Sequence, residues 1–293
     1  MKEYILSQPF LIERFFKDYI MINFNGKIVV KNDFNLVYNN RAFAYGDGLF
    51  ETLKFQNNTI QFVEDHYFRL MASMRMLRME IPNYFTLTFF NDEIVKLITA
   101  NKLTQSVRVK FQIFRKEGGL YLPKTNDINY LIEVSALNIS EKKSKYELDL
   151  FKDYYVYSGL LSTLKTNNRI INVLASIYAA ENNLDNCILI NEKKNVVEVN
   201  NANIFIIKGN EIKTPAITSG CIKGIVRKKV IEILQKNDDF TLTETEISPF
   251  ELQKADALFI TNSIIGIQAI SNYRKTEYDT SIVEKIISDF SIF

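Results

Sequence analysis

Residues 41–54 read Arg-Ala-Phe-Ala-Tyr-Gly-Asp-Gly-Leu-Phe-Glu-Thr-Leu-Lys and lead into a run in which apolar and polar positions alternate. This alternation predicts a strand over residues 49–55, and a second strand follows over residues 59–63. Asn57-Asn58 lies between the two strands and is typical of a tight hairpin turn. From about Asp65 the apolar residues recur at helical spacing, so a helix is expected to follow the hairpin.

Working outward, the chain on both sides of this stretch also mixes strands and helices. Residues 22–24 and 27–30 form a predicted hairpin, because the intervening Asn25-Gly26 suits a type I′ turn. Three more elements are expected before residue 138: a helix capped by Asn91 or Asp92, and strands over residues 107–114 and 130–137. The first half is therefore predicted to be α+β.

The second half is predicted to contain short strands and three helices. Its expected strands cover residues 154–157, 187–190, 196–199, 204–207 and 257–261. Its expected helices cover residues 168–181, residues 225 to beyond 234, and a segment whose start at Ser248 carries Pro249 and Glu251 as in a capping box.

The domain boundaries follow from a polar, charged segment over residues 138–145, which we interpret as a linker. We expect an extension over residues 1–20, an α+β domain over 21–140 and a second domain over 141–293. Met21 begins the first predicted strand, so residues 1–20 are either native or the product of a mis-assigned start codon.

Composition excludes several classes of protein. The 293 residues are 47% hydrophobic and 24% charged, with a net charge of +2, which is the mixture of an ordinary globular protein and not of a disordered chain. No concentrated basic block predicts nucleic-acid binding, and no apolar run is long enough to span a membrane. The two cysteines cannot form the framework of a secreted mini-protein, so we expect a cytoplasmic protein with reduced thiols.

Generic catalytic patterns are mostly missing from the sequence. A single histidine, His66, cannot build a multi-histidine metal site, and we interpret it as a surface or hydrogen-bonded structural residue. No cysteine pair at metal spacing and no glycine-rich nucleotide motif is found, so no metal is expected. What remains is lysine, glutamate and arginine chemistry together with helix N-termini, which suits a carbonyl cofactor that carries a phosphate.

Four stretches match that chemistry in chain order. They are residues 41–54 with 64–70, residues 163–169 (Thr-Leu-Lys-Thr-Asn-Asn-Arg), residues 197–205 (Val-Glu-Val-Asn-Asn-Ala-Asn-Ile-Phe) and residues 220–227 (Gly-Cys-Ile-Lys-Gly-Ile-Val-Arg). In this order they resemble the class IV aminotransferases, the fold-type IV enzymes that use pyridoxal 5′-phosphate (PLP). The resemblance covers residues 21–270. It implies a smaller N-terminal α+β domain, a larger C-terminal domain of mixed sheet or barrel with helices, a small-molecule amino substrate and a homodimer.

The resemblance also assigns cofactor roles to individual residues. Lys165 matches the lysine that holds PLP as a Schiff base, and Glu198 matches the carboxylate that pairs with the pyridine nitrogen. Arg69 matches the phosphate arginine. Further predicted contacts are the backbones of Ile225 and Val226 at a helix N-terminus for the phosphate, Ser263 as a further phosphate hydroxyl or an ordinary turn serine, and Asn168 at the cofactor ring or its 3′-oxygen.

The branch of the family is predicted from two loops. The loop after Arg115 lacks the Arg-x-His pair of the D-amino-acid branch, and residues 166–169 depart from the Gly-Gly-Asn-Tyr run of branched-chain enzymes. The Lys-x-x-Asn-Arg pattern at residues 165–169 and the Gly-Gly pair at residues 118–119 look more like 4-amino-4-deoxychorismate lyase. A branched-chain transaminase is the alternative.

Four residues are predicted to serve the substrate. Thr52 is a candidate for assisting proton transfer, or it is an ordinary strand threonine. Lys54, Arg108 and Lys110 are candidates for holding substrate carboxylates. Arg108 and Lys110 share one strand face, which is equally consistent with a solvated face.

Overall fold

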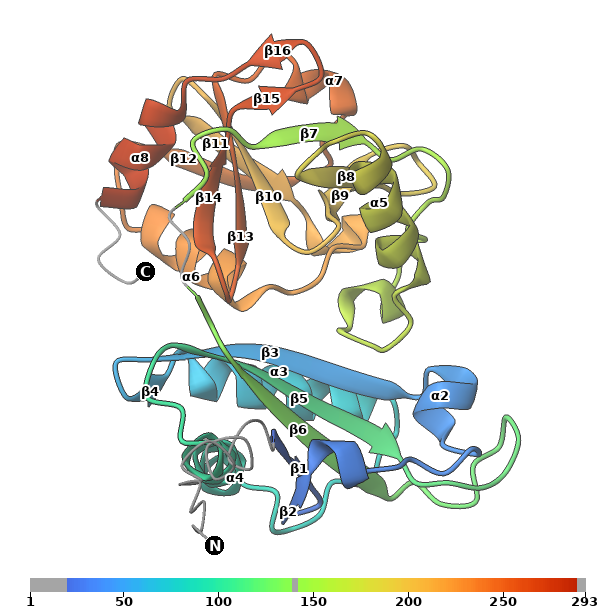
Figure 1. Ribbon diagram of the computed structural model, residues 1–293. Helices are drawn as coiled ribbons and strands as arrows, with labels where there is room; N and C mark the ends of the chain where they lie inside the picture. Colours follow the sequence, from blue (N-terminus) through green and yellow to red (C-terminus); the bar gives the residue numbers. More distant parts are fainter. Residues whose placement is uncertain (1–19, 139–141, 289–293) are drawn as a thin grey trace, which may run out of the picture.

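The structure is a computed structural model that describes residues 20–138 and 142–288, and Figure 1 shows these residues as two bodies. The first body contains a six-stranded sheet in the order β2-β1-β6-β5-β3-β4, with every neighbouring pair antiparallel. Its strands are β1 (Met21–Phe24), β2 (Lys27–Val30), β3 (Gly48–Gln56), β4 (Thr59–Ile60), β5 (Val107–Arg115) and β6 (Ile128–Ala136).

Both predicted hairpins of this sheet are present. Asn25 and Gly26 have φ angles of 50° and 83°, the left-handed pair that a type I′ turn requires. The second hairpin is shorter than predicted. Its strand β4 ends at Ile60, because Val63 already begins the following helix.

Two helices, α3 (Val63–Met76) and α4 (Leu87–Ala100), pack on this sheet and share one buried apolar core with β3 and β5. The prediction that Asn91 or Asp92 caps α4 is wrong. The cap is Thr86, whose side chain accepts a hydrogen bond from the backbone N–H of Phe89 at 3.2 Å. The apolar run that follows Thr86 therefore lies inside the helix, with Phe90 fully buried. Two short elements were not predicted: η1 (Lys31–Asp33) and α2 (Arg41–Tyr45).

The second body contains two five-stranded sheets, in the orders β12-β11-β10-β13-β14 and β16-β15-β7-β8-β9. Both mix parallel and antiparallel pairs. Their inner faces share one core, to which Leu148 and Ile188 contribute from one sheet and Ile204 and Leu258 from the other. The strands are β7 (Glu147–Leu150), β8 (Asn186–Ile190), β9 (Val196–Val199), β10 (Asn203–Lys208), β11 (Glu211–Pro215), β12 (Thr241–Thr245), β13 (Ala257–Asn262), β14 (Gly266–Ile270), β15 (Asn272–Tyr273) and β16 (Thr276–Glu277).

One predicted strand of this body is wrong. Residues 154–157 form no strand, and only Val156 makes an isolated bridge, to Asn191. The chain instead reaches the sheet through β7, which was not predicted because its sequence, Glu-Leu-Asp-Leu, is short and half polar. The strands β11, β12, β14, β15 and β16 and the helix over Thr280–Ser288 were also not predicted.

Four helices accompany these sheets: α5 (Ile170–Glu181), α6 (Ile225–Leu234), α7 (Pro249–Leu252) and α8 (Thr280–Ser288). Ser248 and Glu251 form the predicted capping box of α7. The predicted apolar face of α5 is only partly buried, because Val173 and Ile177 are 50% and 49% exposed. In the part of the chain that the structure describes, no helix has both the length and the apolar character needed to cross a membrane.

The two bodies meet where the segment before α5 pairs with β3. The backbone N–H of Phe50 donates to the Lys165 carbonyl at 2.9 Å, and the N–H of Asn167 donates to the Gly48 carbonyl at 2.9 Å. Lys165 is thereby held between the N-terminal sheet and the second body. The domain boundary at 140/141 stays a prediction, since residues 139–141 and most of the predicted extension (1–19) lie outside the described residues.

Candidate active site

Lys165 lies between η2 (Leu161–Thr163) and α5, with its ammonium group 4.5 Å from the centroid of the Phe50 ring. Arg169 bridges the carbonyls on both sides of this lysine: Nε donates to Thr166 at 3.0 Å, and Nη2 donates to Leu164. Burial lowers the pKa of Lys165 to about 8, and the positive charges of Arg69 and Arg169 act in the same direction. With this pKa, about one tenth of the Lys165 side chains are free amines at pH 7 and about one half at pH 8. The free amine is the form that a nucleophile or a base requires.

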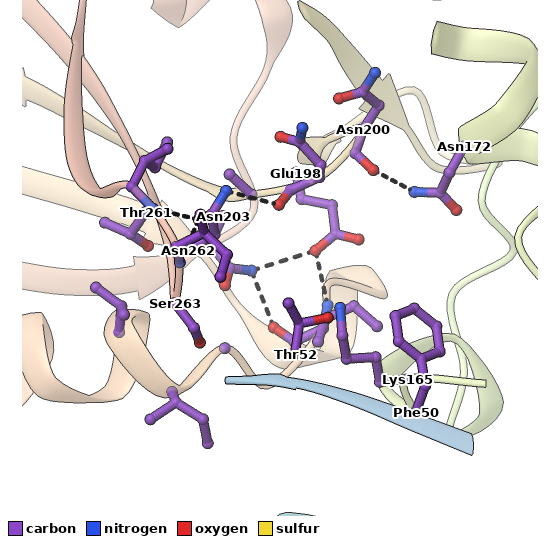
Figure 2. A pocket seen from close by; sticks show the side chains of 18 of the residues that line it. Phe50, Thr52, Lys165, Asn172, Glu198, Asn200, Asn203, Thr261, Asn262 and Ser263 are labelled. Carbon is purple, nitrogen blue, oxygen red and sulfur yellow. Dashed lines mark hydrogen bonds between the residues drawn. The ribbon is translucent and has the colours of Figure 1, made fainter. Parts of the chain in front are cut away.

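Glu198 on β9 is 6% exposed and faces the same space (Figure 2). Its Oε2 accepts hydrogen bonds from the backbone N–H of Ile222 at 2.9 Å and from Asn203 Nδ2 at 3.3 Å. Burial raises the pKa of Glu198 to about 7, although Ile222, Arg169 and Lys165 oppose the shift. A buried carboxylate of this kind suits a ligand group that carries a proton and can donate it in a hydrogen bond.

A candidate anion-binding cradle lies at the start of α6 (Ile225–Leu234). Among the described residues no side chain caps this helix, so the N–H groups of Ile225 and Val226 are available to a ligand. The N-cap is Gly224, where a Cβ atom would stand 1.9 Å from Asn203 Oδ1, so the close approach of the chain requires glycine. The neighbouring Lys223 carbonyl accepts a hydrogen bond from Arg69 Nη1 at 2.8 Å, which brings the guanidinium on α3 to the same cradle.

These groups line one cavity of about 700 Å³ between the two bodies, which is within the usual range for small-molecule sites. Figure 2 shows Phe50 and Thr52 on β3 beside Lys165, with Glu198 and Ser263 across the cavity. The predicted residues that line it are Lys165, Thr52, Arg69, Glu198, Ile225, Val226, Ser263 and Arg108.

A phosphate-bearing aldehyde with a basic ring nitrogen fits this set of groups. The cavity offers an amine, a buried carboxylate, a guanidinium and free backbone N–H groups. Two further lining atoms, Thr261 Oγ1 and Asn200 Oδ1, are buried with no hydrogen-bond partner among the described residues. A ligand that supplies hydrogen-bond donors would remove the cost of leaving them unpaired.

Comparison with known proteins identifies the family. A family model described as amino-transferase class IV matches residues 48–273. The chain belongs to the class IV aminotransferase family. The resemblance and the fold class expected from the sequence are thereby confirmed.

Individual members of this family are distant and differ in activity. The chain is 25% identical over 248 residues to the aminodeoxychorismate lyase of Vibrio harveyi, covering 81% of this chain and 87% of that protein. It is 23% identical over 261 residues to the D-alanine aminotransferase of Bacillus licheniformis, covering 85% and 87%. The fold matches the branched-chain aminotransferase of Thermoproteus uzoniensis with a TM-score of 0.83 at 20% identity, covering 92% of this chain and 93% of that one.

Three other predicted residues, Lys54, Lys110 and Asn168, do not line this cavity. In the β3–β5 register Lys54 stands opposite Arg108, and Thr52 stands opposite Lys110. All four side chains therefore share the sheet face that carries Phe50. Burial lowers the pKa of both lysines. Asn168 lies farther away, because its Nδ2 donates to the Gly46 carbonyl at 3.1 Å and it lines a second cavity.

Sequence reasoning missed two groups, the buried carboxylate of Glu51 and the bridging guanidinium of Arg169. Glu51 is 1% exposed and His66 0% exposed, so the surface alternative for His66 is wrong and the hydrogen-bonded alternative holds. A signal for Glu51 was present, because strand alternation places it on the same buried face as Leu49, Leu53 and Phe55. A carboxylate on such a face must have buried partners.

Proposed function

We propose that the protein is a PLP-dependent 4-amino-4-deoxychorismate lyase, which releases pyruvate and forms 4-aminobenzoate for folate synthesis. The observation that carries the proposal is the convergence of Lys165, Glu198, Arg69 and the α6 N-terminus on one cavity. When bound there, PLP would supply an electron sink for the charge left on the substrate after proton removal.

Each end of the cavity has a role in this proposal. Glu198 would hold the ring nitrogen, and Arg69 with the backbone of Ile225 and Val226 would hold the phosphate. Lys165 would hold the cofactor aldehyde and would remove the proton from the amine-bearing carbon of the substrate. Its pKa of about 8 suits both tasks, since the amine form is available near neutral pH. Thr52 lies on the same wall and can assist the proton transfer.

The cationic face of the N-terminal sheet suits the two carboxylates of the lyase substrate. Arg108 lines the cavity, and Lys54 and Lys110 stand on the same face. A substrate with two carboxylates would be matched by these cations, whereas an aliphatic side chain would gain nothing from them.

A transaminase that moves an amino group to 2-oxoglutarate is the alternative. It would use the same Lys165 and Glu198, and the cations would hold the second carboxylate of 2-oxoglutarate. Similarity to the D-alanine aminotransferase of Bacillus licheniformis, at 23% identity, keeps transamination open.

The deciding experiment is a product assay on PLP-loaded protein supplied with aminodeoxychorismate. We expect 4-aminobenzoate and pyruvate to form together, and both to disappear in Lys165→Ala. Cofactor bound through Lys165 without either product would refute the lyase. A screen of amino donors with 2-oxoglutarate would then test the transaminase.

We also propose a homodimer, which would cover apolar residues around the second cavity. Tyr121, Leu122 and Tyr157 line this cavity and are 91%, 84% and 75% exposed. Exposed apolar side chains grouped in this way are typical of a protein–protein contact surface. Light scattering should give twice the chain mass for the native protein and the chain mass for a Tyr121→Lys, Leu122→Lys double variant. A monomeric native protein would contradict the proposal.

A further inference from the structure

A hydrogen-bond chain leads from the buried face of β3 to the phosphate end of the cavity. His66 Nδ1 lies 2.7 Å from Glu51 Oε2, and His66 Nε2 lies 3.4 Å from Ser263 Oγ. Glu51 and His66 are 1% and 0% exposed, whereas Ser263 lines the cavity. The serine hydroxyl is thus the only member of the chain that a ligand in the cavity can touch.

The charge of Glu51 determines which nitrogen of His66 carries a proton. Burial acts to raise the pKa of Glu51, but Arg69 and His66 lower it to about 2, so Glu51 is a carboxylate. A carboxylate only accepts hydrogen bonds, and Nδ1 of His66 must therefore carry a hydrogen. Burial lowers the pKa of His66, so without a ligand the ring is neutral and Nε2 is a bare acceptor.

This tautomer determines the direction of the Ser263 hydroxyl. A bare Nε2 accepts the serine hydrogen, which leaves only oxygen lone pairs toward the cavity, and lone pairs repel a phosphate oxygen. When Nε2 is protonated it donates to Ser263 instead, and the serine hydrogen becomes free to bind the phosphate.

We propose that His66 is a positioning residue that turns the Ser263 hydroxyl from acceptor to donor, so that binding of a phosphate dianion beside Arg69 is accompanied by protonation of His66 Nε2. The proton comes from solvent or from a phosphate monoanion, which then binds as the dianion. This inference rests on the proposed function, which puts the cofactor phosphate at this end of the cavity.

The groups that face His66 set the size of the effect. Glu51 faces it from β3 and favours the charged ring, while Arg69 on α3 and Lys165 before α5 oppose it. A phosphate dianion would offset these two cations. An opposite charge within about 4–6 Å moves a pKa by about one to three units. Because the pKa of His66 starts below its ordinary 6.5, a doubly protonated ring near pH 7 requires a rise toward the upper end of this range, and that is the rise we expect.

His66 is the only histidine in the 293 residues, so its protonation can be observed without assignment. Tag-free protein labelled with ¹⁵N-histidine is titrated from acid to alkaline pH by NMR, with and without pyridoxamine 5′-phosphate, which forms no covalent bond to Lys165. We expect a neutral ring protonated at Nδ1 in the free protein near pH 7, and a doubly protonated ring in the complex.

Three variants separate two effects on His66: its hydrogen bond with the Ser263 hydroxyl, and the electrostatic field of the phosphate. Ser263→Ala retains the field and removes the link, so the upward shift should shrink and the affinity for pyridoxamine 5′-phosphate should fall about tenfold, as expected for one lost bond to a charged group. Ser263→Thr keeps a hydroxyl and should restore both. Ser176→Ala is the matched control, because Ser176 lines the same cavity but bonds to Asn172 and Asn200, and it should leave the His66 signal unchanged.

The outcomes are distinguishable. A neutral His66 in the complex, or a Ser263→Ala complex that titrates as the native one does, overturns this inference and leaves the proposed function standing. If pyridoxamine 5′-phosphate does not bind at all, the proposed function fails. The same titration with inorganic phosphate then decides the role of His66 by the same criterion.

Discussion

Replacing Arg169 with methionine tests how the structure prepares Lys165. Methionine keeps an unbranched apolar stem but removes the two donors that bridge the Leu164 and Thr166 carbonyls, together with a positive charge that lowers the pKa of Lys165. The substitution should therefore change both the stability of the fold and the protonation of the lysine.

The expected magnitudes follow from these contacts. Hydrogen bonds from a charged donor are each worth about 1.5–3 kcal/mol. Because Arg169 is partly exposed, we take the lower end, about 3 kcal/mol for both bonds, which corresponds to a loss of roughly 6–12 °C in Tm. Removing one nearby charge should raise the pKa of Lys165 by about one unit. From a pKa of about 8, the free amine at pH 8 would then fall from about one half to about one tenth.

The assay is a short pulse of an amine-reactive reagent on cofactor-free protein, with labelling of Lys165 quantified by peptide mass spectrometry across pH. Labelling at pH 8 should be about fivefold slower in Arg169→Met, in proportion to the free amine. Arg169→Lys should keep the native pH midpoint, because it retains the charge, while losing part of the thermal stability. Arg274→Met is the matched control, since Arg274 pairs with Asp149 in the second body. A folded Arg169→Met protein with the native midpoint would refute the reasoning.

Three further predictions concern two buried carboxyl groups and the glycine at the start of α6. Glu51 has a pKa of about 2, below its ordinary 4.5, so about 3 kcal/mol of stability should be present above pH 4.5 and lost as the pH falls toward 2. The stability of Glu51→Gln, measured by acid unfolding, should lack this decline. The same loss of stability at low pH in the variant and the native protein would contradict the prediction. Glu198 has a pKa of about 7, above its ordinary 4.5, so cofactor-free protein should lose up to about 3 kcal/mol as the pH rises from 4.5 through 7. Urea unfolding of Glu198→Gln should show a flatter pH profile, and a profile parallel to the native one would count against the raised pKa. Gly224→Ala would place a Cβ 1.9 Å from Asn203 Oδ1 and should lower the free energy of unfolding by about 1–3 kcal/mol. Calorimetry should show a lower Tm, and pyridoxamine 5′-phosphate should bind more weakly. Native values of both would show that the backbone can relax at this position.

The amino-acid sequence by itself determined those elements whose pattern is local. The alternation from Leu49 to Phe55 predicted β3, and Asn25-Gly26 predicted the hairpin of β1 and β2, because side-chain period and turn chemistry act over a few residues. The order of the motifs around Lys165, Glu198 and Gly224 was sufficient to indicate the family.

Elements without such a local pattern could not be predicted. The strand β7 and the edge strand β12 are short and partly polar, so they read as loops until neighbouring strands supply their hydrogen bonds. The apolar face of α5 was visible in the sequence, but whether Val173 and Ile177 are buried depends on what packs against them.

Only the tertiary structure decided the electrostatics of the candidate site. Glu51, His66 and Arg69 come together because α3 packs on β3, and Ser263 joins them from the far end of the chain. Burial and neighbouring charge then shift their pKa values, and both depend on distances that no local pattern records. The sequence therefore indicated which side chains can take part in the chemistry. Packing determined which of them are charged and in which direction their hydrogen bonds run.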